Sequence, residues 1–450
     1  MLDEPQNGSE KLFDQFKDLI HQAASCKVCI TLDWLSVYFV DKLGLVPEAV
    51  GIDDVKQITE TISIRFFGKG TEHYKYTWHV LKNGEFLATI LSHTRNEKFV
   101  KKGVIKIDFK NHLLYTASLW PLYYELIDVF KLEYKNIGRV DIAIDGLNYV
   151  MDFMNLYVKQ EPDKKVMEMC YEGLRKVMKA KKGTINKPVE MKGGRARLNC
   201  KVLDRKSMKY QNFGLGVSSA RKSISMYNKS LDIVKSGKTY IQDFWIANGV
   251  CTTVLPISAL QPIYKDREDK IYLDGFENIY RFEVRLKGEM ISQIKDFKVE
   301  WLKDKDWLMS IVKRMNQNYF EFVYYTFSDI SKCKPVDLMP YEMYDTKNVD
   351  LNEAKPKDDF YKTKLSLKKN VRQLYLGNLQ AGDYGVAQML MFDISNFELE
   401  MWFNNHLPDW IKEYDAIQPD KDYCADVGNY LTDIGNKLLN KEITGLIIAA

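Results

Sequence analysis

The sequence predicts an α+β fold, a mostly antiparallel sheet backed by helices. Short segments that alternate apolar and polar residues recur through the first 290 residues. Asn83-Gly84 separates two of these segments at the spacing of a tight hairpin. Residues 119–134 instead have helical periodicity. An apolar fraction of 46% over 450 residues is enough for folded cores and predicts two or three domains.

The chain divides into four predicted parts. Residues 1–25 are expected to be a polar leader with a short helix, and residues 26–330 a mixed α+β domain. Residues 331–358 are rich in Pro, Asp and Lys and predict a linker. Residues 359–450 have helical spacing and predict a small helical domain.

Neither a membrane-spanning segment nor a disulfide framework is expected. No apolar run approaches the roughly 20 residues that span a bilayer. The acidic, polar N-terminus is unlike a signal peptide. Seven scattered cysteines do not suggest paired disulfides, and "CKVC" at 26–29 runs into a predicted strand. We therefore expect a soluble, cytoplasmic protein.

Positive charge is concentrated in one block of the chain. Residues 164–222 contain 17 Lys or Arg against four Asp or Glu. A block of this kind suits a polyphosphate partner, because binding releases the counterions of neutralised phosphates. The alternative is a solvated loop, which is the simpler explanation for "KAKKGTINK" alone.

Three predicted strands carry carboxylates or a tyrosine on the side opposite their apolar residues. In "RVDIAID", Asp141 and Asp145 lie opposite an apolar face. In "SISMYNKS", Tyr227 and Lys229 share the polar side. In "YRFEVRLKG", Glu283 shares its side with two arginines and a lysine. If these strands form one sheet with its apolar face on helices, the open polar face gathers all three sets.

That face predicts a chemistry. Three carboxylates on one open face repel each other unless a cation lies among them, and oxygen ligands suit Mg²⁺ or Mn²⁺. A divalent ion could polarise a phosphodiester, and Tyr227 could attack it with help from Lys229 or a carboxylate. The simpler alternatives are strand solvation for Asp141, a turn cap for Asp145, and a cross-strand ion-pair ladder for Glu283. Tyr227 would then be an ordinary half-buried tyrosine.

In order along the chain, these motifs resemble the Rep_trans family of rolling-circle plasmid replication initiators and the related relaxases of integrative elements. "RVDIAID", "GLGVSSARKSISMYNKS" and "RFEVRLKG" resemble its three strand motifs, and "TLDWLSVYF" resembles its opening strand. The resemblance covers about residues 28–330. It implies a catalytic sheet related to the two-histidine nickases, although the six histidines here form no His-x-His pair.

The resemblance also implies roles for single residues. Tyr227 would be the nucleophile, with Lys229 assisting, and Asp141, Asp145 and Glu283 would be metal or acid–base residues. Where the family has Arg-φ-Tyr, this chain has Ser225-Met226-Tyr227, so Arg221 or Lys222 would have to hold the phosphate. The predicted DNA-binding residues are Arg139, Arg195, Arg197, Arg221, Lys222, Arg281 and Arg285.

The expected function is a metal-dependent nicking enzyme that initiates rolling-circle replication. Its partners would be single-stranded or cruciform origin DNA, a host helicase and polymerase, and a second copy in a homodimer. The C-terminal domain would read the duplex origin. Three alternatives remain open: a mobilisation relaxase with the same chemistry, a non-catalytic origin-binding protein, and a nuclease without a covalent step.

Overall fold

A computed structural model gives the fold. It describes residues 6–22, 26–48, 51, 54–95, 97, 100–159, 188–192, 198–200, 203–204, 209–217, 220–264, 273, 275–326 and 329–352. The predicted C-terminal domain, 359–450, lies outside the described residues. The chain divides into a unit of Met1–Asn352 and a unit of Glu353–Ala450, and all the described residues belong to the first.

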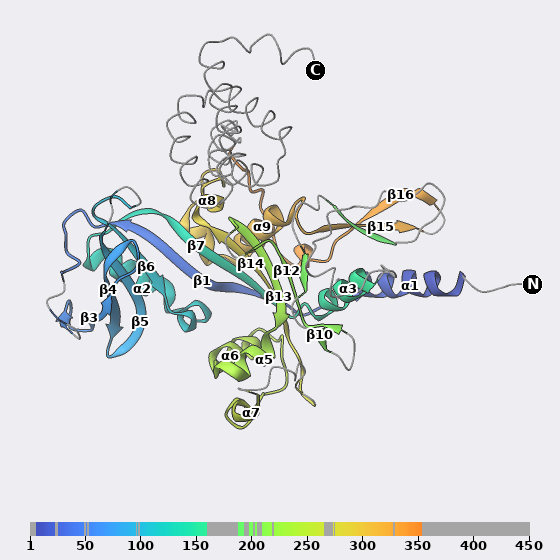
Figure 1. Ribbon diagram of the computed structural model, residues 1–450, viewed down its shortest axis with the longest axis horizontal. Coiled ribbons are helices and arrows are strands. Elements are labelled where there is room, and N and C mark those ends of the chain that lie inside the picture. The colour runs from blue at the N-terminus through green and yellow to red at the C-terminus, as the bar shows by residue number, and fades with distance from the viewer. Residues whose placement is uncertain are drawn as a thin grey trace, which may run out of the picture. The chain divides into compact units, whose positions relative to one another are not determined.

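One large antiparallel sheet dominates the fold (Figure 1). Its eleven described strands lie in the order β2 (Val55–Gln57), β3 (Ile62–Lys69), β4 (Tyr74–Lys82), β5 (Glu85–Thr94), β6 (Val104–Phe109), β1 (Cys29–Val40), β7 (Glu133–Asp145), β14 (Tyr280–Lys287), β13 (Lys222–Asn228), β12 (Asn212–Leu215) and β9 (Leu198–Cys200). The mixed architecture with a mostly antiparallel sheet is therefore confirmed. Its relation to the two-histidine nickases stays a prediction.

The three strands that carry the predicted site are neighbours. β14 lies between β7 and β13 and pairs with each in antiparallel register. Asp141 lies opposite Arg285, Asp145 opposite Arg281, and Tyr227 also opposite Arg281. The expectation that these motifs share one sheet is confirmed. β13 is shorter than expected, because it ends at Asn228.

The outer strands β2–β6 form one lobe, and the long strand β1 connects it with the site strands by pairing with β6 on one side and β7 on the other (Figure 1). The predicted hairpin turn joins β4 to β5. Asn83 and Gly84 both have positive φ, 51° and 84°, as a two-residue hairpin with the right twist requires.

Alternation places one face of the site strands in the core. Val140, Ile142 and Ile144 of β7 are fully buried, as are Phe282 and Val284 of β14. Burial of side chains of this size contributes roughly 1.5–3 kcal/mol each, which fixes the register, because a one-residue slip would expose the whole set.

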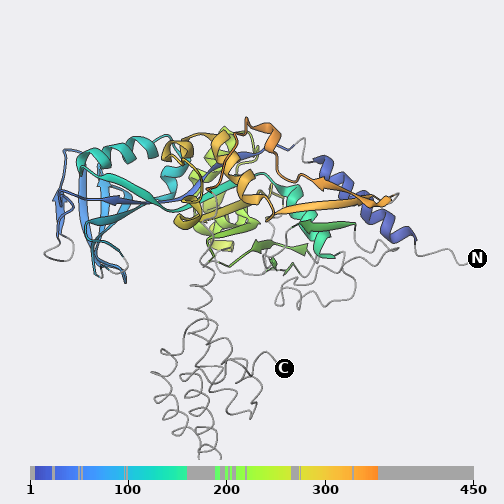
Figure 2. The ribbon, with the colours of Figure 1, turned by 90° about the horizontal axis from the view of Figure 1, so that it is seen from above.

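Helices flank the sheet (Figure 2). Those described are α1 (Gln6–Gln22), α2 (Leu119–Val129), α3 (Asn148–Lys159), α5 (Lys229–Ser236), α6 (Thr239–Ala247), α7 (Ile257–Tyr264), α8 (Gly288–Ile291) and α9 (Lys305–Asn316), with 3-10 turns η2 (Asn111–Tyr115), η3 (Val299–Lys303) and η4 (Tyr341–Met343). α5, α6 and η2 supply side chains to the polar face of the site strands. The polar face is therefore covered at this end, where an open face was expected.

The predicted linker is wrong over most of its length. β16 (Asp329–Val336) pairs with β15 (Glu321–Thr326), which pairs in turn with β8 (Val189–Lys192). Leu351 bridges to Ile294, and Val349 is buried. Residues 329–352 thus belong to the folded unit. A second short pair, β10 (Leu203–Asp204) with β11 (Lys209–Tyr210), completes the described strands.

The short helix expected in residues 1–25 is present as α1, but it is docked on the folded unit and is not a separate leader. Phe16 is fully buried and packs edge-to-face on Phe153 of α3, with ring centroids 5.0 Å apart. Phe13 packs on Tyr324 of β15 at 5.5 Å. Among the described residues, no helix is long and apolar enough to span a membrane.

Candidate active site

Tyr227 points from β13 toward the carboxylate of its neighbour strand. Its hydroxyl donates to Glu283 Oε2 at 3.0 Å. Burial first, and then the charge of Glu283, raise the pKa of Tyr227 well above its usual value. The phenol is therefore neutral at physiological pH, and it needs a base before it can act as a nucleophile.

Lys229 reaches the same hydroxyl from a different element. It is the first residue of α5, whose preceding residue, Asn228, caps the helix by accepting from the Leu231 amide at 3.0 Å. Its Nζ lies 3.4 Å from the Tyr227 oxygen and 2.8 Å from Asp232. Burial and then the Arg281 charge lower the pKa of Lys229 from its usual value. Helix geometry, and not the expected strand parity, brings Lys229 to Tyr227.

Glu283 has the ionisation of a general base. Burial, followed by the charges of Asp33 and Asp141, raises its pKa from 4.5 to about 7. Arg281 and Arg285 oppose that shift without cancelling it. A carboxylate with a pKa near the working pH can both accept and return a proton.

Arg281 holds two carboxylates together in the interior. It is 0% exposed. Its Nε and Nη2 donate to the two oxygens of Asp145, each at 2.7 Å, and its Nη1 donates to Asp33 at 2.6 Å. Trp245 of α6 also donates to Asp145, at 2.7 Å. Arg281 was expected to contact DNA, but in this structure it is an internal organiser of the site.

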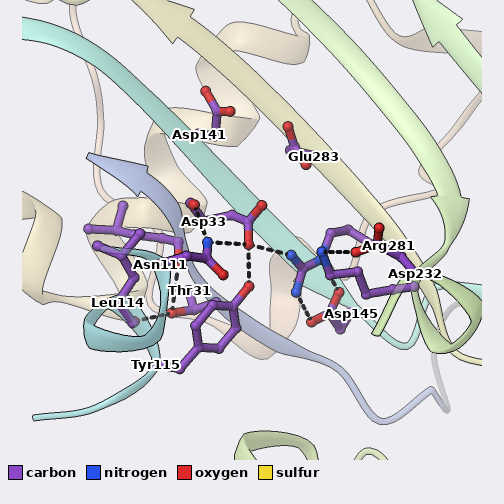
Figure 3. A network of polar contacts seen from close by, with 12 residues as sticks. Thr31, Asp33, Asn111, Leu114, Tyr115, Asp141, Asp145, Asp232, Arg281 and Glu283 are labelled. Atoms are coloured by element: carbon purple, nitrogen blue, oxygen red, sulfur yellow. Dashed lines mark hydrogen bonds and ion pairs between the residues drawn. The ribbon is translucent and has the colours of Figure 1, made fainter. Parts of the chain in front are cut away.

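Asp33 is a site residue that the sequence prediction did not assign (Figure 3). It lies at an irregularity of β1, where the pairing with β7 shifts between Leu32 and Trp34. Asp33 accepts from Arg281, from Asn111 at 3.1 Å and from the Tyr115 hydroxyl. Burial opposes ionisation, but the Arg281 and Lys229 charges outweigh it and lower the pKa of Asp33.

Asp141 is buried on the polar face between two partly exposed arginines. Arg139 donates to Asp141 at 2.8 Å, and Arg285 donates to it at 3.2 Å and to Glu283 at 3.4 Å. The Arg139 guanidinium also stacks over Trp34, 4.5 Å from the ring centroid. Trp34 is 38% exposed. Two arginines and a tryptophan thus line the approach to Glu283.

The three predicted metal ligands do not come together as a metal site. In the part of the chain that the structure describes, no group of three or more His, Cys, Asp or Glu side chains is arranged to hold an ion. Both oxygens of Asp145 are taken by Arg281 and Trp245, and Asp141 lies between Arg139 and Arg285. In this structure both aspartates are paired with arginines, which they would have to release in order to bind Mg²⁺ or Mn²⁺. Binding of an ion there stays a prediction.

Two further predicted DNA-binding residues, Arg221 and Lys222, contact residues other than Tyr227 and its partners. Arg221 pairs with Glu289 and is exposed. Lys222 donates to the Met315 carbonyl at 2.6 Å and lies 4.0 Å over the Tyr319 ring. Burial and then the Arg314 charge lower the pKa of Lys222 to about 8. Arg195 and Arg197 lie outside the described residues.

Sequence reasoning missed Asp33, Asn111, Tyr115 and Trp245. The only sequence signal was at Asp33, an acidic residue that interrupts the apolar run of "CITLDWL". Asn111 and Tyr115 belong to η2, and Trp245 to α6, so their place at the site depends on how distant segments pack.

The comparisons with known proteins find only distant likeness, and that among solved structures. No protein-family model matches the sequence, and no curated protein matches it. A solved structure, described as that of a rolling circle replication initiator protein from Geobacillus stearothermophilus, is similar with a TM-score of 0.36 and 15% identity, over 69% of this chain and 93% of that chain. At this distance the likeness identifies neither family nor activity, so the inference about function depends on the site itself.

Proposed function

We propose that this chain is a DNA nicking enzyme that initiates rolling-circle replication, with Tyr227 as its nucleophile. The observation that carries the proposal is the hydrogen bond from the Tyr227 hydroxyl to Glu283 at 3.0 Å, with Lys229 at 3.4 Å from the same oxygen. A nucleophile, a base and a cation at one oxygen are what covalent catalysis by a neutral phenol requires.

The proposed step begins with proton transfer. Ionised Glu283 takes the proton of Tyr227, and the phenolate oxygen attacks the phosphorus of a phosphodiester. The bond between phosphorus and the 3′ oxygen breaks, and that oxygen leaves with a proton from solvent as a free 3′ hydroxyl. Lys229 stabilises the negative charge on the phenolic oxygen before attack. In the reverse step, protonated Glu283 returns its proton to Tyr227.

The approach to Glu283 suits a single strand of DNA. Arg139 and Arg285 are partly exposed and can reach phosphate oxygens, which fixes the backbone without reading sequence. Trp34 offers a ring on which an unpaired base can stack. The proposed substrate is therefore single-stranded or extruded cruciform DNA, and the 3′ hydroxyl would prime a host polymerase.

The test is trapping of a covalent adduct. A 3′-labelled single-stranded oligonucleotide from DNA flanking the gene is incubated with the protein, once with Mn²⁺ and once with a chelator, and resolved on a denaturing gel. The labelled fragment keeps the 5′ phosphate, so we expect it to migrate with the protein. Tyr227→Phe should abolish this band.

Tyr240→Phe is the matched control, because Tyr240 donates to Asn111 at 2.7 Å beside the site without touching Glu283. It should keep the adduct. An adduct that persists in Tyr227→Phe contradicts the nucleophile, and cleavage without any adduct indicates a nuclease of another kind. If the unaltered protein shows no cleavage, and its salt-dependent DNA binding survives Glu283→Ala, the chain is a non-catalytic origin-binding protein. A relaxase would form the same adduct, and only its genetic context distinguishes it.

A further inference from the structure

Three aromatic rings form a stacked column on the outer lobe of the sheet. Phe67 of β3 stacks on His79 of β4, with centroids 4.2 Å apart and planes at 24°. His79 stacks in turn on Phe86 of β5, at 3.9 Å and 26°. The Lys110 ammonium lies over Phe86, 3.9 Å from its centroid. The column thus ends in a cation at one side and in Phe67 at the other.

Phe67 is unusually exposed for an aromatic residue on a strand. It is 64% exposed and lies at a bulge between Phe66 and Gly68. Phe66 packs on the buried Trp78, at 5.5 Å, whereas Phe67 packs on His79. Trp78 and His79 are adjacent on β4 and face opposite sides of the sheet, so Phe66 lies on the side of the core and Phe67 on the other side. A phenylalanine this exposed does not serve the core.

The column lies on the same face of the sheet as the candidate active site. Residues directly opposite each other on antiparallel strands share a face. The pairing gives one such row across six strands: Arg139, Ser36, Asp108, Thr89, His79 and Arg65. From β7 to β4 the row covers four strand spacings, roughly 20 Å. The row therefore links the Arg139 end of the site to the column.

The charge around the column favours an anionic ligand. Arg65 lies beside His79 in the pairing, and Lys110 lies at the end of the stack. The acidic residue within the row, Asp108, is neutralised by Lys106 at 3.0 Å. Burial, followed by the Lys110 and Arg65 charges, lowers the pKa of His79, so its ring is neutral at physiological pH and stacks as an aromatic.

We propose that the Phe67–His79–Phe86 column is a second binding site for single-stranded DNA, in which an unpaired base stacks on Phe67 and extends the column. Arg65, opposite His79, contacts a phosphate next to that base, and Lys110, at the Phe86 end of the column, contacts a phosphate further along the strand. The proposal rests on the proposed function, because it assumes that DNA is the ligand. In this proposal the outer lobe binds a part of the substrate strand that is distant from the nucleotide at Tyr227.

The test measures binding separately from chemistry. In the Tyr227→Phe background, fluorescence anisotropy gives the affinity for labelled oligothymidine and for a duplex of equal length at one salt concentration. Base–aromatic stacking predicts that Phe67→Leu weakens oligothymidine binding about 5- to 100-fold. Phe67→Tyr keeps the ring and should bind like the parent. Val254→Ala removes an exposed apolar side chain outside the lobe and should change nothing.

Two results would overturn the proposal. One is unchanged oligothymidine affinity in Phe67→Leu with the parent binding well, which would make the column a stabilising cross-strand contact only. The other is an equal loss of duplex binding, because paired bases offer no free face. Thermal unfolding of each variant shows that Phe67→Leu is folded. The adduct assay with Tyr227 intact separates the two proposals. If the protein forms the adduct and Phe67→Leu binds oligothymidine as well as the parent, only the proposed second site is wrong. If Phe67→Leu loses oligothymidine binding but no adduct forms with Tyr227 intact, only the proposed nicking function is wrong.

Discussion

At the scale of single residues, burial determines what Glu283 can do. The same carboxyl in water would be fully ionised and a weak base. In the site, burial and the nearby Asp33 and Asp141 charges raise its pKa to about 7. The neighbouring Tyr227 is shifted upward as well, so the proton stays on the phenol until Glu283 accepts it.

The first prediction concerns the pH dependence of adduct formation. Because the active form of Glu283 is the carboxylate, the single-turnover rate should rise with pH and level off above about 7. Below that pH it should fall about tenfold per unit. Glu283→Gln should lower the plateau by about 10²–10⁴-fold and abolish the dependence near pH 7. A variant that keeps the same pH profile would show that another group is the base.

The second prediction concerns the buried charge of Arg281. Arg281→Met removes the partner of Asp145 and Asp33 and leaves two carboxylates unpaired in the interior. We therefore expect the free energy of unfolding, measured in urea, to fall by about 3–5 kcal/mol. Arg221→Met is the control, because the exposed pair of Arg221 with Glu289 should contribute at most about 1 kcal/mol. Equal effects in the two variants would contradict the organising role of Arg281.

At the scale of elements, α1 shows how a short polar helix can be part of the core. Most of its residues are polar, which made it look like a separate leader. Phe13, Phe16 and Leu19 nevertheless share one face and are buried. The partners of that face, Phe153 and Tyr324, come from elements far along the chain.

The third prediction follows from this docking. Phe16→Ala should reduce the free energy of unfolding by about 3–5 kcal/mol, because it leaves a cavity against Phe153. Lys17→Ala, next to it on the exposed face, should change stability by less than about 0.5 kcal/mol. Chemical denaturation of both variants measures the difference. A small effect of Phe16→Ala would mean that α1 is only loosely attached.

At the scale of the whole molecule, the folded unit extends past the predicted boundary at residue 330. β16 pairs with β15, and Val336, Leu338 and Met339 are buried in the same core as the sheet. The Tyr149 hydroxyl also donates to the Leu338 carbonyl at 2.5 Å. Residues 331–352 read as a linker because they lack a sustained period, yet they supply apolar contacts to the core.

The fourth prediction concerns truncation. A chain that ends at Asn352 should unfold cooperatively, whereas one that ends at Ile330 loses most of β16 and the apolar residues after it and should not. Circular dichroism during heating distinguishes the two. Cooperative unfolding of the shorter chain would show that 331–352 is dispensable.

The sequence pattern was enough to predict the strands of the site and the common face of Asp141, Tyr227 and Glu283, because side-chain alternation is a local property of a strand. It also predicted the Asn83-Gly84 turn, because positive φ is a local preference. Lys229 was assigned to the right oxygen for the wrong reason, since it lies on a helix.

The partners of each carboxylate, by contrast, follow from how distant segments pack together. Asp145 and Asp33 are held by Arg281 because β1, β7 and β14 meet in one register, and Trp245 reaches Asp145 because α6 packs over that end of the face. Burial and the field of neighbouring charges then set the pKa of Glu283. These effects depend on residues far apart in the chain: Asp33 and Arg281 are separated by 248 positions. Contacts over such a separation leave no local pattern in the sequence.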